Sequence, residues 1–279
     1  MTTTLRPAGP LQQSAEGAKS RSYEVCVNGR PVGVVDLRTD DAFGPSWGVV
    51  GGLRIDEPDR GRGRGTVAAL AAEEVLRGWG CTHVRVCVPA GAPGALRMAA
   101  ALGYVERSSH MLKELPLRPP ELPAGVGGRG MREDEYGQWR TAAVSDHAQV
   151  WTDLGVAEAD ARARAEADHR RRLPEGLATA GTVIDVLVAD GGVVGHVWVS
   201  EAEVLPGRRG TLVLKVEVAE EHRGRGHGRS LMLLAEREAI AAGSRLIRLN
   251  VFAGNAPALR LYESLGYRTV ERHCAKRLL

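Results

Sequence analysis

One segment of the chain occurs twice. When residue n is set beside residue n + 163, residues 60–104 align with residues 223–267 without a gap, and 19 of the 45 positions are identical. The identities gather in three blocks, RGRGRG with RGRGHG, VPAGAPGALR with VFAGNAPALR, and ALGY with SLGY. Compositional bias alone does not produce ungapped blocks of this kind. Two copies are too few for a solenoid, so the 279 residues are expected to form two related domains.

Both copies predict the same alternation of strands and helices. β-Branched runs before and after Asp190-Gly191-Gly192 are typical of a β-hairpin, as is the pattern around Asn28-Gly29. For the second copy we expect strands over 183–189, 193–200 and 212–218, a helix over 230–242, a strand over 246–252, a short helix over 256–265 and a last strand over 269–278. For the first copy we expect strands over 23–27, 32–37, 47–55 and 84–88, with a helix after Gly65. The fold class is therefore α/β, with a mixed sheet flanked by helices.

The segment 115–130, LPLRPPELPAGVGGRG, divides the two copies. Proline removes backbone donors and glycine is costly to order, so this stretch is typical of a linker. We expect four parts. They are a poorly ordered leader over 1–20, a first domain over 21–115, a linker over 116–130 and a second domain over 131–279.

Composition excludes several classes of protein. A formal net charge of +3 and 25% charged residues give no general indication of nucleic-acid or membrane binding. The four cysteines form no CxxC pair and have no histidines at metal-ligand spacing, so neither a metal site nor a disulfide framework is expected. The first twenty residues lack the apolar region of a signal peptide, and no apolar run is long enough to span a membrane. The expected location is the cytoplasm.

Both glycine loops are expected to bind an anion. Each follows a predicted strand and opens a predicted helix, where unpaired N–H groups and the helix dipole favour negative charge. Arg223, Arg225 and Arg229 add charge in the second loop. The spacing GxGxG lacks the Lys-Ser/Thr of a Walker loop and the GxGxxG of a dinucleotide fingerprint, which disfavours nucleoside triphosphates and NAD. Two alternatives stay open, an RNA-binding Arg-Gly tract and a tight turn with solvated arginines.

The second loop belongs to a longer pattern. R-x-x-G-x-G is followed by L-N-V-F-x-x-N-x-x-A-x-x-L-Y-x-x-L-G-Y. This combination resembles the GNAT N-acyltransferase superfamily over nearly all of 131–279, with RLPEGLATAG and GHVWVS similar to one bacterial subgroup. The first half resembles the same superfamily over about 23–115, in a truncated form without the leading helices.

The resemblance implies acetyl transfer from acetyl-CoA to an amine in a ternary complex, without a metal. It implies that the second loop holds the CoA pyrophosphate and that the strand before it binds the pantetheine arm. It also implies that Tyr262 protonates the leaving thiolate and that Asn255 contacts the cofactor arm or caps the helix. The implied cofactor contacts are Val216, Val218, Arg223, Gly224, Arg225, Gly226, Gly228, Arg229 and Asn255.

The general base is less defined by the sequence. Glu217 lies on the strand before the loop, where alternation puts it on the same face as Lys215. Glu201 and Glu203 on the neighbouring strand are alternatives, and His196 is taken as a structural histidine. We therefore predict Tyr262 and Glu217 as the catalytic residues.

The first copy differs at the positions that carry chemistry. Ala92 stands where the second copy has Asn255, and Ala99 where it has Tyr262. Its loop still fits the pattern, so a second cofactor loop is predicted at Arg60, Gly63 and Gly65. We expect an N-acetyltransferase with a degenerate first domain acting as an intramolecular pseudo-dimer partner, a homodimer being open as well. The alternative is a non-catalytic acyl-CoA sensor. The acceptor, a small amine, an antibiotic or a polypeptide amine, is not specified by the sequence.

Overall fold

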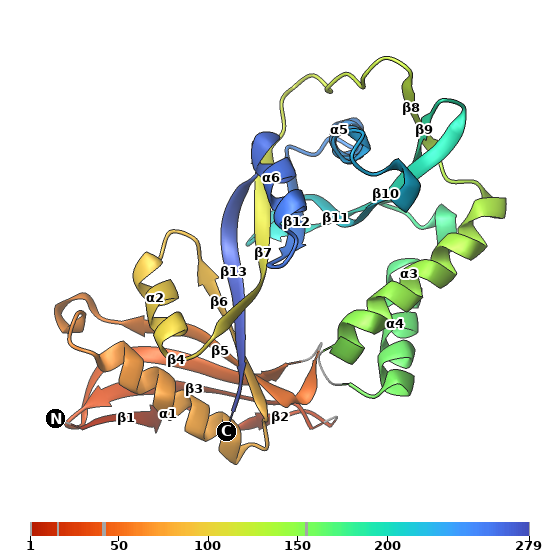
Figure 1. Cartoon of the computed structure of the whole chain (residues 1–279). Helices are drawn as coiled ribbons and strands as arrows, with labels where there is room; N and C mark the ends of the chain where they lie inside the picture. The colour runs from red at the N-terminus through yellow and green to blue at the C-terminus, as the bar shows by residue number, and fades with distance from the viewer. Residues whose placement is uncertain (1, 16, 41–42, 154–155, 279) are drawn as a thin grey trace. The chain divides into compact units, whose positions relative to one another are not determined.

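The structure is a computed structural model, and it describes residues 2–15, 17–40, 43–153 and 156–278 (Figure 1). The chain forms two compact units. Unit 1 comprises Met1–Met111, Val251–Ala256 and Thr269–Leu279, and unit 2 comprises Leu112–Asn250 and Pro257–Arg268. Each unit is a mixed sheet with helices, which confirms the predicted α/β class. In the described residues no helix combines the length and the apolar character needed to cross a membrane.

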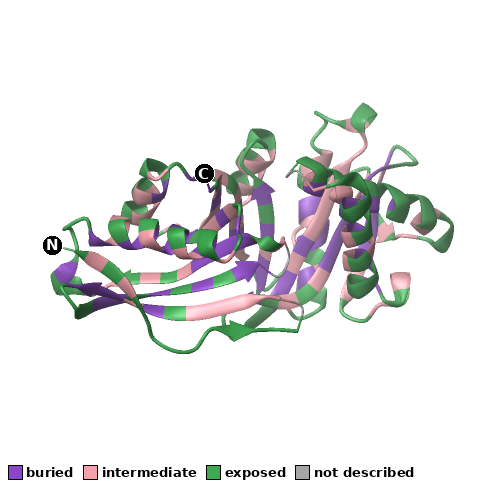
Figure 2. Ribbon diagram, turned by 90° about the horizontal axis from the view of Figure 1, so that it is seen from below, coloured by how far each residue is buried: buried purple, intermediate pink, exposed green. Residues whose placement is uncertain are grey.

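Unit 1 is a sheet with two helices. Its strands run in the order β1-β3-β4-β5-β6-β13-β7, with β2 (Gln12–Gln13) beside β3, and only β5 and β6 are parallel among the pairs with a defined register. The strand bounds are β1 Thr3–Pro7, β3 Lys19–Val27, β4 Arg30–Asp40, β5 Gly44–Ile55, β6 His83–Pro89, β7 Val105–Glu114 and β13 Arg268–Arg277. The short helix η1 (Glu57–Asp59), α1 (Arg64–Gly78) and α2 (Pro93–Ala101) complete it. Ala68, Ala72 and Leu76 of α1 pack on the sheet and close the core. Figure 2 shows the buried positions along the strands in purple.

Unit 2 has helices on both faces of its sheet. Its strand order is β12-β11-β10-β9-β8, with β11 and β12 parallel. The strands are β8 Val126–Gly130, β9 Thr182–Ala189, β10 Gly192–Leu205, β11 Arg208–Val218 and β12 Leu246–Phe252, and the helices are α3 Glu133–Asp153, α4 Glu158–Arg172, η2 Gly176–Ala178, η3 Glu220–His222, α5 His227–Ala241 and α6 Ala256–Ser264. Trp139 and Ala143 of α3 pack with Trp198 of β10 in one core cluster. The leading helices that the first repeat lacks are therefore α3 and α4.

The turns that the sequence predicts are present. Asn28 and Gly29 have φ values of 49° and 82°, and Asp190 and Gly191 have φ values of 51° and 79°. These left-handed conformations favour glycine and tolerate asparagine and aspartate. The β3–β4 hairpin of unit 1 and the β9–β10 hairpin of unit 2 are thus encoded by the same local chemistry.

Two segments that were expected to lack regular secondary structure contain strands. Part of the leader is a strand, because β1 pairs with β3 from Thr3 opposite Val27 to Pro7 opposite Tyr23. The end of the expected linker is β8, which pairs with β9. Backbone pairing with a neighbouring strand satisfies donors and acceptors whatever the side chains are, so weak strand propensity did not prevent either pairing.

The last strand of the second repeat belongs to unit 1. β13 pairs antiparallel with β6, from Glu271 opposite Pro89 to Arg277 opposite His83. Conversely, the residues that follow Met111 at the end of the first repeat belong to unit 2, where the Leu115 N–H donates to the Arg245 carbonyl (2.9 Å). Each unit is thus completed by a piece of the other repeat.

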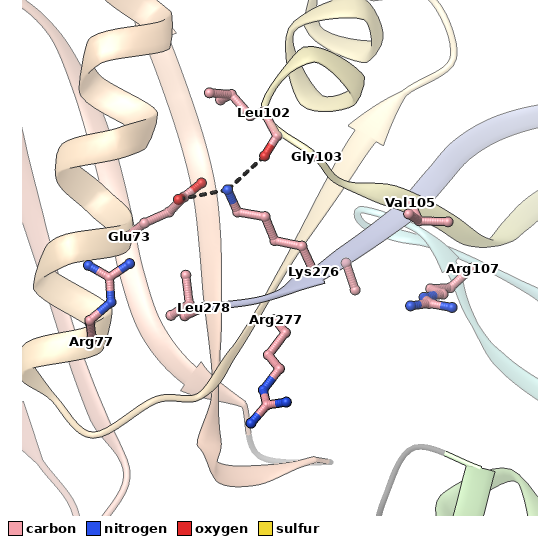
Figure 3. A pocket seen from close by; sticks show the side chains of 10 residues that line it. Glu73, Arg77, Leu102, Gly103, Val105, Arg107, Lys276, Arg277 and Leu278 are labelled. Carbon is pink, nitrogen blue, oxygen red and sulfur yellow. Dashed lines mark hydrogen bonds and ion pairs between the residues drawn. The ribbon is translucent and has the colours of Figure 1, made fainter.

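In unit 1, β13, the strand contributed by the second repeat, carries a lysine that forms an ion pair with a buried carboxylate of α1. The Lys276 Nζ lies 2.8 Å from a Glu73 carboxylate oxygen and 2.7 Å from the Leu102 carbonyl oxygen (Figure 3). The Tyr104 hydroxyl donates to the same carboxylate at 3.0 Å. Glu73 is 4% exposed, so this ion pair is largely removed from water.

Unit 2 contains the same arrangement, related by the 163-residue offset. The Lys113 Nζ lies 2.6 Å from a Glu236 carboxylate oxygen and 5.5 Å from the centre of the Tyr267 ring. Glu236 is 1% exposed. The repeat therefore extends beyond the aligned segment to Lys113 and Lys276, which pair with the glutamates Glu236 and Glu73.

Candidate active site

The predicted phosphate loop of unit 2 has the backbone that anion binding requires. Gly224 and Gly226 have φ values of 76° and 85°, and α5 begins directly after Gly226. A side chain at either position would be strained. The first N–H groups of a helix have no intrahelical partner, so the start of α5 offers them to a ligand.

The arginines of this loop have different surroundings. Arg223 Nε donates to the Val218 carbonyl at 3.3 Å, which ties the loop to the end of β11. Arg229 donates to the Ser264 hydroxyl on α6 at 2.6 Å. Arg225 has an exposed side chain. Arg225 is therefore the loop arginine best placed to meet a phosphate from solvent, while Arg223 shapes the loop.

The first loop repeats this backbone with one substitution. Gly61 and Gly63 have φ values of 71° and 74°, and Arg60 Nε donates to the Ile55 carbonyl at 2.7 Å. Arg64, at the position of His227, is buried and forms an ion pair with Asp59. The fold thus keeps the same turn in unit 1, although its inner arginine is engaged within the protein.

The strand before the second loop separates from its neighbour. In the described residues, β11 pairs with β12 over Thr211–Val213, which lie opposite Ile247–Leu249. Its pairing with β10 continues as far as Val218. In the β10–β11 pair, Trp198 lies opposite Lys215, and the next residue, Val199, lies opposite Val213. Leu214 is therefore an extra residue and forms a bulge in β11. Beyond the bulge, in the described residues, β11 has no β12 partner. This open edge contains Val216 and Val218, where the pantetheine arm is predicted to bind.

Glu217 and a histidine face each other next to this edge. His196 is directly opposite Glu217 in the β10–β11 pair, and its Nε2 lies 3.5 Å from a Glu217 carboxylate oxygen. The Lys215 Nζ lies 3.1 Å from the same oxygen and also pairs with Asp146 of α3. Burial lowers the pKa of His196 to about 4, so the imidazole is neutral near pH 7. The sequence treated His196 as structural, yet the fold makes it the partner of the predicted base.

An aromatic cluster lies on the same side of the sheet and was missed by the sequence analysis. The rings of Trp139 and Trp198 have centroids 5.6 Å apart, and His169 of α4 lies 5.3 Å from Trp198. All three are buried, and in the described part of the chain Nε1 of each tryptophan and Nδ1 of His169 have no hydrogen-bond partner. Buried indole N–H groups usually find an acceptor. In the described residues these polar atoms are instead enclosed in the packed cluster without an acceptor.

Tyr262 lies on α6, half-buried. Its ring centroid is 6.0 Å from that of Tyr267, which is 2% exposed and packs in the interior. Burial raises the pKa of the Tyr262 phenol above its usual value, which keeps the hydroxyl protonated and able to donate. Asn255 directly precedes α6, and its backbone N–H donates to the Phe252 carbonyl at 2.9 Å.

Unit 1 lacks the corresponding chemical groups. In the β4–β5 pair, Val34 lies opposite Arg54, at the positions that His196 and Glu217 occupy in the β10–β11 pair. A cleft of about 740 Å³ is lined by Arg54, Ala92 and Ala99, among others. In the described residues the first repeat has thus retained a cleft and a loop, but it has no acid–base pair at the positions of His196 and Glu217 and no phenol at the position of Tyr262.

Comparison with known proteins agrees with this geometry. The model of the Acetyltransferase (GNAT) family matches residues 4–104 and 142–267, one match for each repeat. The chain belongs to this family, and it is an N-acetyltransferase built from two tandem GNAT repeats.

Several known proteins are similar to the chain over most of its length. A mycothiol acetyltransferase of Saccharomonospora viridis is 29% identical over 96% of this chain and 86% of its own length. Another, of Thermobispora bispora, is 32% identical over 80% and 74%. Among solved structures, a GCN5-related N-acetyltransferase from Sphaerobacter thermophilus has a TM-score of 0.60 at 20% identity, covering 92% of this chain and 80% of that one. A tandem GNAT protein from the clavulanic acid biosynthesis pathway has a TM-score of 0.52 at 23% identity, covering 94% and 84%. The two structures share the fold.

Proposed function

We propose that unit 2 transfers the acetyl group of acetyl-CoA to an amine in a ternary complex, while unit 1 acts as its degenerate partner. One observation carries this assignment. In the described residues, the second copy of the glycine loop is accompanied by Glu217 with His196 on the preceding strands and by Tyr262 on α6, whereas the first copy has Arg54, Val34 and Ala99 at these positions. The expected cytoplasmic location and the pseudo-dimer arrangement of the repeats remain predictions.

The proposed cofactor site joins the loop to the open strand edge. The N–H groups at the start of α5 and Arg225 would hold the pyrophosphate, with Gly224, Gly226 and Gly228 allowing close approach. The main chain of β11 at Val216 and Val218 would bind the pantetheine arm. A backbone N–H directed at the thioester oxygen stabilises the developing oxyanion by roughly 3–4 kcal/mol in comparable sites.

The reaction would use one proton acceptor and one proton donor. Glu217 takes a proton from the acceptor ammonium, and the neutral imidazole of His196 lies 3.5 Å from its carboxylate. The free amine attacks the thioester carbon and forms a C–N bond. The nitrogen of the tetrahedral intermediate loses its extra proton to solvent. The intermediate then collapses, the C–S bond breaks, and Tyr262 gives its proton to the departing thiolate and regains one from solvent.

For the acceptor we propose a polar amine, and first the mycothiol precursor that lacks the acetyl group. The names of the relatives suggest this molecule. The sensor alternative is disfavoured, because a binding module has no need for a base and a phenol around its ligand.

An amine panel tests the proposal. We expect the full-length enzyme to release free thiol from acetyl-CoA with the desacetyl precursor of mycothiol, and more slowly or not at all with apolar amines and peptides. Tyr262→Phe should slow turnover without loss of cofactor affinity, whereas Tyr267→Phe, at the packed neighbour, should not. Cofactor binding without thiol release for every amine would contradict the catalytic assignment and favour a sensor.

The two loops offer a matched pair of variants for the cofactor site. We expect Gly226→Val to abolish turnover, because valine is strained at a φ of 85° and its side chain occupies the space of the phosphate. Gly63→Val places the same strain at a φ of 74° in the first loop. Turnover should survive in Gly63→Val, and calorimetry of both variants would count the acetyl-CoA sites. Unchanged affinity in Gly226→Val would refute the phosphate assignment, and a stoichiometry falling from two to one in Gly63→Val would mean that the first loop also binds the cofactor.

A further inference from the structure

Unit 1 brings four metal-ligand side chains together on one face of its sheet. Cys87 comes from β6, His110 from β7, and Glu271 and His273 from β13, the strand that lies between the other two. His273 is directly opposite Cys87 in the antiparallel β6–β13 pair, so both side chains point to the same face. Glu271 precedes His273 by two residues and shares that face. None of the four has a role in the proposed acetyl transfer.

The donor atoms lie at metal-site distances. His273 Nε2 is 3.0 Å from His110 Nδ1, which is 3.2 Å from a Glu271 carboxylate oxygen, and that oxygen is 4.0 Å from His273 Nε2. One donor atom of each of Cys87, Glu271 and His273 lies within 4.8 Å of the other two. Zinc bonds of 2.0–2.3 Å in a tetrahedron separate the donors by about 3.3–3.8 Å. Small side-chain movements would therefore bring Cys87, Glu271 and His273 around one ion, and His110, whose Nδ1 is 3.0 Å from His273 Nε2, is placed to supply a fourth ligand.

The chemistry of the donors selects the kind of ion. One thiolate and two imidazoles are the ligands that zinc and similar first-row transition ions prefer, whereas magnesium and calcium prefer oxygen. A thiolate and a carboxylate also balance the charge of a divalent cation. Cys87 is exposed, and the side chains of His110 and His273 are 26% and 19% exposed, so an ion can enter from solvent. We propose that Cys87, His110, Glu271 and His273 form a binding site for a divalent transition metal, with zinc as its first candidate.

This site departs from the expectation that the chain binds no metal. The ligands are separated by 23, 161 and 2 residues along the chain, so no local spacing reveals them. His110 and His273 are related by the 163-residue offset, whereas Cys87 corresponds to Asn250 and Glu271 to Ser108. The repeat-related positions therefore do not form a second site with the same four ligands.

Binding would have a structural consequence. Two of the four ligands lie on β13, the strand that the second repeat contributes to unit 1, and the other two lie on the strands at either side of it. A bound ion would join these three strands and stabilise the C-terminal strand in the sheet. Ions that bind only the folded state raise its stability by mass action.

Cobalt(II) provides a direct test on the tag-free, full-length protein after treatment with a chelator. We expect saturable binding of one Co²⁺ per chain, with the visible bands of a tetrahedral ion and a thiolate-to-cobalt charge-transfer band, and loss of the colour when Zn²⁺ is added. Zn²⁺ should also raise the melting temperature and slow hydrogen exchange in β13. Weak binding without a thiolate band, or binding at many sites, would overturn the proposal.

Single variants separate this site from general binding to histidines and thiols. Cys87→Ser should remove the charge-transfer band, and at an exposed position it should leave the fold intact by circular dichroism. His110→Ala and His273→Ala should each weaken binding about tenfold or more. His83→Ala is the matched control. His83 is a half-buried histidine of β6 that is not among the proposed ligands, and its ring stacks on Trp47 with centroids 4.7 Å apart. A charge-transfer band that persists in Cys87→Ser, or a loss of affinity in His83→Ala equal to that in His273→Ala, would contradict the assignment.

Discussion

Glu217→Gln is expected to lower kcat for acetyl transfer by about 10²–10³-fold at neutral pH, because a positioned proton acceptor contributes on the order of 10²–10⁴. Glutamine keeps the size of the side chain and its contact with Lys215, which lies 3.1 Å from the carboxylate, but it does not accept the proton of an ammonium. The affinity for acetyl-CoA should stay unchanged, since Glu217 is not among the proposed cofactor contacts. Thiol release against amine concentration, together with calorimetric binding of acetyl-CoA, measures both quantities.

The pH profile distinguishes a base from a structural ion pair. As the pH approaches the pKa of the acceptor amine, more acceptor is already deprotonated in solution, so the deficit of Glu217→Gln should shrink. A merely structural defect would stay constant across that range. The matched control is Glu201→Gln, which removes a carboxylate of β10 that pairs with Arg209 at 3.1 Å on an exposed part of the strand. A larger loss in Glu201→Gln than in Glu217→Gln would transfer the role of the base to β10.

Features that depend on local spacing could be predicted from the sequence. The glycine loop and the helix that carries Tyr262 are continuous segments, and their φ values and boundaries follow from the residues that form them. The repeat likewise predicted that unit 1 would retain the turn and lose the phenol, because Ala99 stands at the position of Tyr262.

Features that depend on the register between strands could not be predicted. His196 faces Glu217 because β10 and β11 pair in one particular register. The bulge at Leu214 separates this part of the β10–β11 pair from the part that begins at Val199 opposite Val213. A shift of one residue would send His196 to the other face. The contact between Lys276 and Glu73 depends in the same way on which sheet receives the last strand.

Lys276→Met is expected to lower the free energy of unfolding by about 3–5 kcal/mol, the usual cost of removing one partner of a buried ion pair. Methionine matches the length of lysine and fills its space, but in the described residues it leaves the Glu73 carboxylate with the Tyr104 hydroxyl as its hydrogen-bond donor. The loss should be greatest in β13, because Lys276 ties this strand to α1 through Glu73. Denaturant unfolding gives the free energy, and hydrogen exchange of the β13 amides gives the location.

Three further variants determine whether the buried charge is the cause. In Lys276→Met/Glu73→Gln the unpaired charge is absent, so much of the lost stability should return. Lys113→Met, in the repeat-related pair with Glu236, should cost a similar amount but accelerate exchange in unit 2. Arg209→Met breaks an ion pair in which both side chains are well exposed, 74% and 45%, and should cost less than about 1 kcal/mol. An equal, small effect for Lys276→Met and Arg209→Met would mean that the exchanged strand is held by its backbone pairing with β6 and by packing, and that the duplicated lysine–glutamate pair contributes little to the tandem fold.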